Sequence, residues 1–254
     1  MESIHLSFEL LAFLFGTATV AAFLDTLAGG GGLLSLPALI LSGIPPLFAL
    51  GTNKLQGSMG TATATFMMLR KRRVRWEDVK ILMLAAFIGS TLGTCAVQFI
   101  DTAMLTFIIP GVLVVIAVYF LFSPLPSETA TEPKLPLSLY RNLVVPVIGW
   151  YDGMFGPGTG SFFALAGVSL RGQGLIHSTA VAKTLNFSTN ISSLLVFLVA
   201  GKVVWTAGIL MMAGQALGAW AGSHCLFMIN PKFLRILIVV MCLGMLVKFF
   251  FTLY

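Results

Sequence analysis

The chain has 254 residues, of which 57% are hydrophobic and only 9% are charged, and its formal net charge is +6. A soluble globular domain carries about 25% charged residues, so this composition excludes an ordinary soluble domain and indicates an integral membrane protein. The positive charge does not indicate nucleic-acid binding, because five of the fifteen basic residues fall in the short loop 70–75. Such a loop between apolar segments is typical of the cytoplasmic side of a membrane protein, where it meets lipid headgroups.

The apolar segments, taken in chain order, predict an all-α polytopic membrane protein. They lie at 6–28, 33–43, 46–69, 79–99 and 104–122, and then at 142–155, 161–170, 175–200, 205–227 and 233–253. A helix that crosses the hydrocarbon core needs about 20 apolar residues. The last three segments of each half reach that length, whereas 33–43, 142–155 and 161–170 are too short to span alone. The first segment is long enough to span but can instead pair with 33–43.

The two halves of the chain predict two homologous repeats, 1–122 and 142–254. Segment 123–141 holds four prolines and predicts a cytoplasmic linker between them. A shift of 129 residues aligns Lys54 with Lys183, and a shift of 127 residues aligns Asp25 with Asp152. Matches between charged residues in the same order indicate an internal repeat rather than a shared apolar background.

The basic residues also predict how the repeats are oriented. If the two short segments of the second half form a hairpin that reaches mid-membrane, Arg171 lies on the cytoplasmic side with the loop 70–75. Lys232 and Arg235 then lie on the same side, and Lys202 lies outside. This count favours inverted repeats by a small margin.

Each repeat contains an aspartate directly before a glycine-rich break, at 25–32 and at 152–160. The sequence therefore predicts glycine-broken or re-entrant helices whose N-termini point to the membrane centre, where they would form an anion site. Close helix packing is the alternative interpretation, and it accounts for isolated glycines such as Gly89 and Gly218 better than for four in a row. The glycines predicted to contact a substrate are Gly29, Gly30, Gly31, Gly32, Gly156, Gly158 and Gly160.

Charged side chains within the apolar segments complete the predicted site. Asp25 and Asp152 either cap the broken helices or carry coupled protons. Lys54 and Lys183 lie about 12 Å into their segments at about 1.5 Å per residue. This depth disfavours snorkelling to the interface and predicts pairing with an anionic substrate or with the aspartate of the same half. The polar neighbours predicted to orient the substrate are Asn53, Gln56, Asn186 and Asn190.

The sequence contains no Walker A, HExxH or GxSxG pattern and no cluster of metal ligands. ATP hydrolysis, a cofactor, a metal site and an enzymatic activity are therefore not expected. Gln215 either lines a pathway or forms a hydrogen bond between helices.

Four runs of the sequence resemble motifs of the TauE/SafE sulfite exporter family. They lie at 25–39, 49–56, 151–161 and 182–190. The resemblance covers about residues 10–250. It implies a multi-pass permease of the bacterial inner (plasma) membrane with two related halves, and some members of the family export sulfite or organosulfonates. The second break reads Gly-Pro-Gly-Thr-Gly where the first has four glycines, so the two breaks need not bind identically.

Together these observations predict a secondary transporter that moves a small anion by alternating access. The anion is expected to be a sulfur oxyanion or an organosulfonate such as sulfite. An anion channel and a non-transporting membrane scaffold remain alternatives. The expected partners are the small anion and the lipid bilayer, without nucleic acid, and a homodimer is compatible with the sequence.

Overall fold

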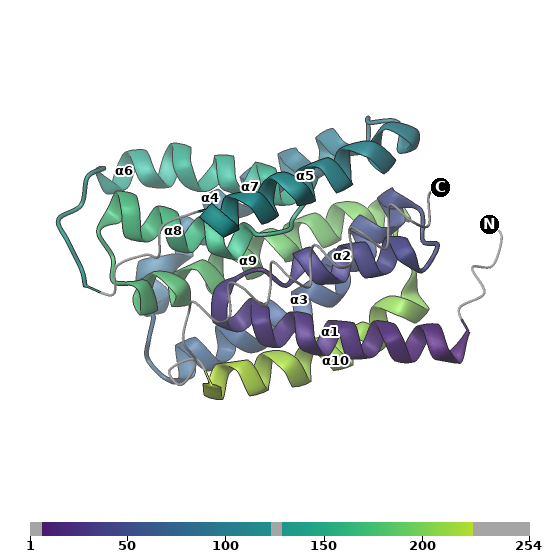
Figure 1. Ribbon diagram of the computed structural model, residues 1–254. Coiled ribbons are helices and arrows are strands. Elements are labelled where there is room, and N and C mark those ends of the chain that lie inside the picture. The colour runs from purple at the N-terminus through teal and green to yellow at the C-terminus, as the bar shows by residue number, and fades with distance from the viewer. Residues whose placement is uncertain (1–6, 123–128, 226–254) are drawn as a thin grey trace.

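Helices form every regular element in residues 7–122 and 129–225, the part of the chain that the computed structural model describes (Figure 1). The predicted segment 233–253, with Lys232 and Arg235, lies outside these residues. In chain order the elements are α1 (Phe8–Ala28), α2 (Gly32–Leu41), α3 (Pro46–Arg70), α4 (Trp76–Val97), α5 (Thr102–Phe122), α6 (Leu137–Leu139), η1 (Tyr140–Val144), α7 (Val145–Met154), α8 (Thr159–Arg171), α9 (Leu175–Val199) and α10 (Trp205–Cys225). The second half thus becomes helical at Leu137, within the segment 123–141 predicted as linker.

Helix α1 shows how local sequence sets the ends of an element. The Ser7 hydroxyl accepts a hydrogen bond from the Leu10 amide at 3.3 Å, which caps the first turn. The helix ends at Gly29, whose φ of 82° only glycine adopts readily, and the Gly29 amide donates to the Asp25 carbonyl. Its 21 residues extend for about 32 Å at 1.5 Å per residue, close to the thickness of the hydrocarbon core.

Among the described residues, three helices are both long and apolar enough to cross a membrane: α1, α4 and α5. Helices α3 and α9 have 25 residues each but are more polar. Their polar side chains are buried inside the bundle, including Lys54 of α3 and Lys183 of α9. Both lysines therefore lie inside the bundle rather than at its surface.

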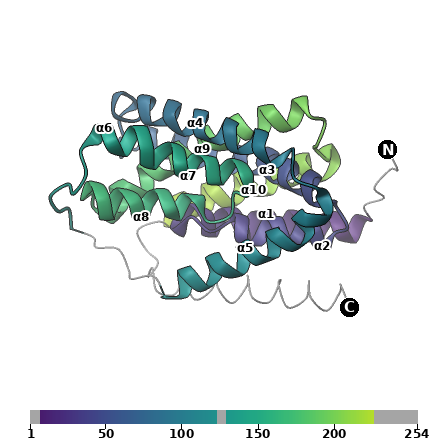
Figure 2. The same ribbon diagram turned by 90° about the horizontal axis from the view of Figure 1, so that it is seen from above.

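Each glycine-rich break joins two helical arms into a hairpin, and the two hairpins enter the bundle from opposite ends. Helix α1 starts at the end near the N-terminus and α2 returns toward it, whereas α6 and α7 start at the other end and α8 returns there (Figures 1 and 2). The breaks between the hairpin arms, residues 29–31 and 155–158, meet in the middle of the bundle. A Cβ on Gly160 would lie 3.1 Å from the Gly29 Cα.

The first arm of each hairpin packs against a glycine-bearing helix with almost no space between backbones. A Cβ added to Gly218 of α10 would lie 2.0 Å from the Thr19 carbonyl oxygen of α1, and one added to Gly93 of α4 would lie 2.0 Å from the Trp150 carbonyl oxygen of α7. These distances are far shorter than a van der Waals contact, so only glycine fits at these two positions. The isolated glycines therefore serve close helix packing, as the alternative interpretation predicted.

Candidate functional site

The first break is held by Asp25 and by the backbone around it. One carboxylate oxygen, Oδ1, accepts a hydrogen bond from the Gly31 amide at 3.1 Å. Gly31 is the N-cap residue of α2, and no side chain of its own caps that helix. Asp25 thus bridges the end of α1 and the start of α2, which is one of the two roles predicted for it.

The second break has a different construction. Gly156 and Gly158 have φ values of +94° and +81°, so Pro157 lies between two residues in the left-handed region. The Pro157 carbonyl accepts from the Tyr151 hydroxyl at 2.6 Å, and the Gly156 carbonyl accepts from the Thr159 hydroxyl at 2.8 Å. Helix α8 starts at Thr159, again without a side-chain cap. Two helix N-termini therefore point into the middle of the bundle from differently built turns.

The two breaks contact each other through their backbones. A Cβ on Gly29 would lie 2.4 Å from the Ser161 nitrogen, and one on Gly32 would lie 3.0 Å from the Pro157 Cα. Glycine at these positions lets the two breaks approach each other closely. The N-termini of α2 and α8 therefore face the same space.

The buried lysines form ion pairs that cross between the halves. The Nζ of Lys54 on α3 lies 2.8 Å from the Asp152 Oδ2 of the second half, and the Nζ of Lys183 on α9 lies 2.8 Å from the Asp25 Oδ2 of the first half. The predicted pairing within the same half is therefore wrong. Each lysine reaches the aspartate that precedes the other half's break, because the hairpins enter from opposite ends and overlap in the middle.

The two ion pairs differ in their surroundings. Lys183 donates to the Asp25 carboxylate and also to its backbone carbonyl, and Asp25 has a second partner in the Gly31 amide. In the other pair the side chains of Lys54 and Asp152 are each 1% exposed. Within the described structure, neither the Lys54 Nζ nor the Asp152 Oδ2 has a hydrogen-bonding partner in good geometry. The second pair is thus held by charge attraction with few supporting hydrogen bonds.

A cavity lies where the breaks and the lysine helices meet. About 40 Å³ of it is open to the centres of water molecules, which is room for about three waters or one small oxyanion. Every lining residue is polar or glycine: Asp25, Gly29, Gly31, Gly32, Ser35, Asn53, Lys54, Gln56, Gly57, Thr61, Asp152, Gly156, Gly158, Thr159, Gly160, Asn186, Asn190 and Gln215.

Most residues predicted for the site line this cavity, and two do not. Gly30 and Lys183 are absent from the lining, and Lys183 instead holds Asp25. Gln215 lines the cavity, which supports the first of the two interpretations left open for it. The side chains that the prediction omitted include Ser35, Thr61 and Thr159. The shift of 129 residues that aligns the lysines also aligns Thr61 with Asn190, and that signal would have found it.

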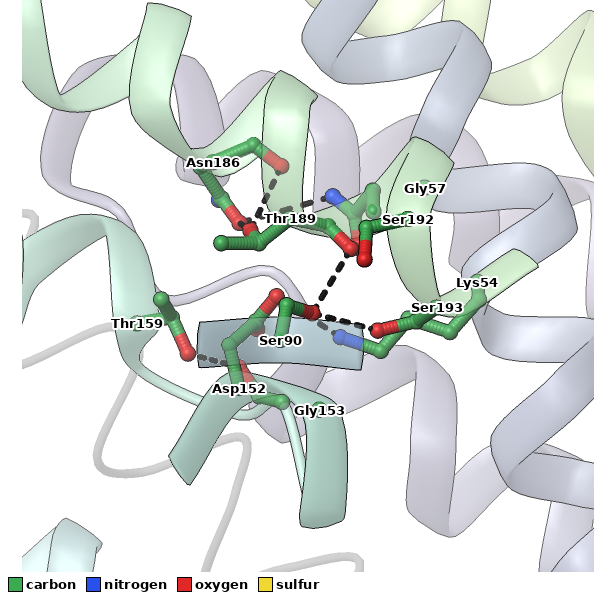
Figure 3. A network of polar contacts seen from close by, with 12 residues as sticks. Lys54, Gly57, Ser90, Asp152, Gly153, Thr159, Asn186, Thr189, Ser192 and Ser193 are labelled. Atoms are coloured by element: carbon green, nitrogen blue, oxygen red, sulfur yellow. Dashed lines mark hydrogen bonds and ion pairs between the residues drawn. The ribbon is translucent and has the colours of Figure 1, made fainter. Parts of the chain in front are cut away.

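A hydroxyl network behind Asp152 was not predicted from the sequence. The Ser90 hydroxyl of α4 lies 2.7 Å from the Ser193 hydroxyl of α9 and donates to the Thr189 carbonyl at 2.9 Å (Figure 3). The Thr94 hydroxyl lies 2.8 Å from the Ser193 hydroxyl and 3.0 Å from the Gly153 carbonyl. These contacts fix α7 next to its break, directly after Asp152.

Known proteins resemble this chain along most of its length. A family model described as "Sulfite exporter TauE/SafE" matches residues 14–249. A "Probable membrane transporter protein" of Haemophilus influenzae is 42% identical over 240 residues, which is 94% of either chain. "Probable membrane transporter protein ORF9" of a Sinorhizobium species is 40% identical over 96% of this chain and 93% of its own length. "Probable membrane transporter protein YfcA" of Escherichia coli K12 is 41% identical over 91% of this chain and 86% of its own length. No solved structure matches the chain.

The long apolar helices, the broken hairpins and the polar cavity agree with these relatives. The chain is a multi-pass membrane protein of the transporter class and not an enzyme. It belongs to the sulfite exporter TauE/SafE family.

Proposed function

We propose that the cavity binds a small oxyanion and that the protein moves it across the membrane as a secondary transporter. The observation that carries this proposal is the meeting of Lys54 and two uncapped helix N-termini, those of α2 and α8, at one buried polar space. The positive end of each helix dipole favours a bound anion at such a place. Asn53, Gln56, Asn186 and Asn190 line the same space and would orient the anion.

The lining of the cavity supports a compact sulfur oxyanion as the substrate. An anion such as sulfite presents oxygens in every direction and would meet polar groups or glycine on all sides. An organosulfonate with a long carbon chain would need apolar contacts, and the lining contains no apolar side chain. Small organosulfonates remain compatible with the volume.

The arrangement of the two halves supports alternating access by inverted repeats, 1–122 and 142–254. The hairpins enter from opposite ends (Figure 1), and the crossed ion pairs join each lysine helix to the hairpin of the other half. A rocking motion of one half against the other would therefore move both breaks together.

The basic residues support an orientation in the inner membrane. His177 lies 3.3 Å from the Arg73 carbonyl, the Lys134 amide donates to the Leu170 carbonyl, and Arg171 donates to the Leu135 carbonyl. The loop 70–75, the linker and the α8–α9 turn therefore lie at one end of the bundle. By the positive-inside rule this end would be cytoplasmic.

The first experiment is thermal unfolding of the purified protein in detergent with sulfite, sulfate, taurine, sulfoacetate, acetate and chloride. A ligand at 100 times its dissociation constant adds about 2.7 kcal/mol of stability, so a true substrate should raise the midpoint clearly. Counterflow in liposomes then tests transport, because a carrier exchanges labelled for unlabelled anion whereas an open channel shows no such stimulation. No shift with any anion in folded protein would contradict the proposal.

A further inference from the structure

The charges of the site cancel when the site is empty. Asp25 and Asp152 are the two acidic residues that line the cavity. They are paired with Lys183 and Lys54. An anion that enters adds a negative charge that the partial charges of the helix N-termini offset only in part, and such a charge is disfavoured in a low-dielectric site. A site built to hold an anion therefore needs one aspartate to become neutral when the anion binds.

The contacts of the two pairs decide which aspartate this is. Asp25 accepts from Lys183 and from the Gly31 amide, so losing its charge would weaken the contacts that hold the break between α1 and α2. Lys183 lies outside the cavity lining and holds the α1 carbonyl as well. The contacts of the Lys183–Asp25 ion pair therefore disfavour its opening.

The ion pair of Lys54 and Asp152 has fewer contacts that would oppose its opening. Both residues line the cavity, and each is 1% exposed. The Lys54 Nζ and the Asp152 Oδ2 have no further hydrogen-bonding partner in the described structure, so separating them breaks no network. An anion oxygen could take the place of the carboxylate beside the ammonium group and supply the hydrogen bonds that the ammonium group lacks.

The surroundings of Asp152 offer few other charges. Helices α4, α8 and α9 pack against α7 and bring hydroxyl and amide groups to this region, such as Thr94, Thr159 and Asn186. The preceding Tyr151 directs its hydroxyl to the Pro157 carbonyl. The titratable groups of η1, Tyr140 and Arg141, lie about 16–18 Å away along the helix at 1.5 Å per residue. Among the described residues, Lys54 is the charged group in contact with Asp152.

We propose that anion binding beside Lys54 is coupled to the uptake of one proton by Asp152, while the Lys183–Asp25 pair stays closed as a clamp between α9 and α1. The proton comes from water on the side to which the cavity is open and binds the carboxylate that the anion displaces. The anion and the proton then cross together, so transport is an anion–proton symport. This inference rests on the proposed function and adds the coupling ion to it.

Calorimetric titration of the purified protein with methanesulfonate tests the coupling. Methanesulfonate keeps one negative charge from about pH 5.5 to 8, a range in which ordinary carboxyl groups outside the site stay ionised. Comparing binding heats in buffers of different ionisation enthalpy counts the protons taken up. We expect one proton for each anion, and an apparent Kd that rises about tenfold per pH unit over the same range.

Two matched variants identify the proton acceptor. Asp152→Asn imitates the protonated carboxyl group, so it should bind the anion without proton uptake and with a Kd independent of pH. Asp25→Asn should still take up one proton. If Asp152→Asn does not fold, Asp25→Asn decides alone, because Asp152 is then the remaining carboxylate of the cavity lining.

Each outcome separates this inference from the proposed function. Anion binding without proton uptake in the wild-type protein would overturn the coupling and leave anion transport intact. Proton uptake that disappears in Asp25→Asn and persists in Asp152→Asn would overturn the assignment to Asp152. No binding of methanesulfonate or of any anion in the thermal panel would overturn the proposed function, and the coupling with it.

Discussion

At the scale of single residues, variants of the buried Lys54–Asp152 pair can separate its contribution to stability from its role in transport. Lys54→Met leaves Asp152 buried without a counter-charge, and breaking a buried pair in this way costs about 3–5 kcal/mol. The double variant Lys54→Met/Asp152→Asn removes both charges and should regain most of that stability, while transport stays lost in both because the ammonium group is absent. Thermal unfolding and liposome flux measure the two effects separately. Full transport by the double variant would contradict a role for Lys54 in binding.

A second residue-level prediction concerns the contact between the breaks. Gly29 and Gly43 both have positive φ, +82° and +78°, but only at Gly29 would a Cβ meet other atoms within 4 Å. Gly43→Ala should cost only the backbone strain of about 1–2 kcal/mol. Gly29→Ala should cost about 1–3 kcal/mol more, because its methyl group pushes the breaks apart, and it should abolish flux. Equal midpoints of thermal unfolding for the two variants would show that the breaks do not touch.

At the scale of helices, close packing of α4 on α7 holds the second hairpin. Gly93→Ala places a Cβ 2.0 Å from the Trp150 carbonyl oxygen, whereas a Cβ on Gly111 of α5 meets nothing within 4 Å. We expect Gly93→Ala to destabilise the protein by about 1–3 kcal/mol. Gly111→Ala should be neutral or stabilising by about 0.5–1 kcal/mol, because alanine favours a helix over glycine. Thermal unfolding of both variants in detergent checks the difference, and a neutral Gly93→Ala would mean that α4 and α7 lie farther apart.

The helices were largely predictable from sequence, and the partners across the site were not. Uninterrupted apolar stretches bounded by glycine, proline or charge set the ends of α1, α3 and α9 to within about two residues. The depth of Lys54 in its segment also argued against snorkelling to the interface. Which aspartate each lysine meets depends on how the hairpins overlap in space, and no local pattern encodes that overlap. The contact between Ser90 and Ser193 was not predicted either, because it depends on how α4 and α9 lie in space. A serine in an apolar helix commonly bonds its own backbone, so the residue type alone does not indicate such a contact.

At the scale of the whole molecule, a carrier should expose the cavity to one side of the membrane at a time. Thr61 lines the cavity from α3, so Thr61→Cys places a thiol there. In a background without Cys95, Cys225 and Cys242, we expect a small impermeant thiol reagent to label it from either side. Saturating anion should raise the rate on one side and lower it on the other. Rates that anion leaves unchanged on both sides would favour a channel.

The crossed ion pairs also have a consequence for how the chain is made. Asp25 and Lys183 are 158 residues apart, so at about 5–20 residues per second the ribosome needs about 8–30 s to supply the lysine after the aspartate. Lys54 follows Asp25 early in that time, and its own final partner, Asp152, is synthesised only 98 residues after it. Until Asp152 is made, Lys54 is the buried lysine available to Asp25 in the nascent bundle. A temporary ion pair between Asp25 and Lys54 would neutralise both charges while the first half is in the membrane without the second. Completing the protein then requires both residues to exchange partners as the second hairpin inserts.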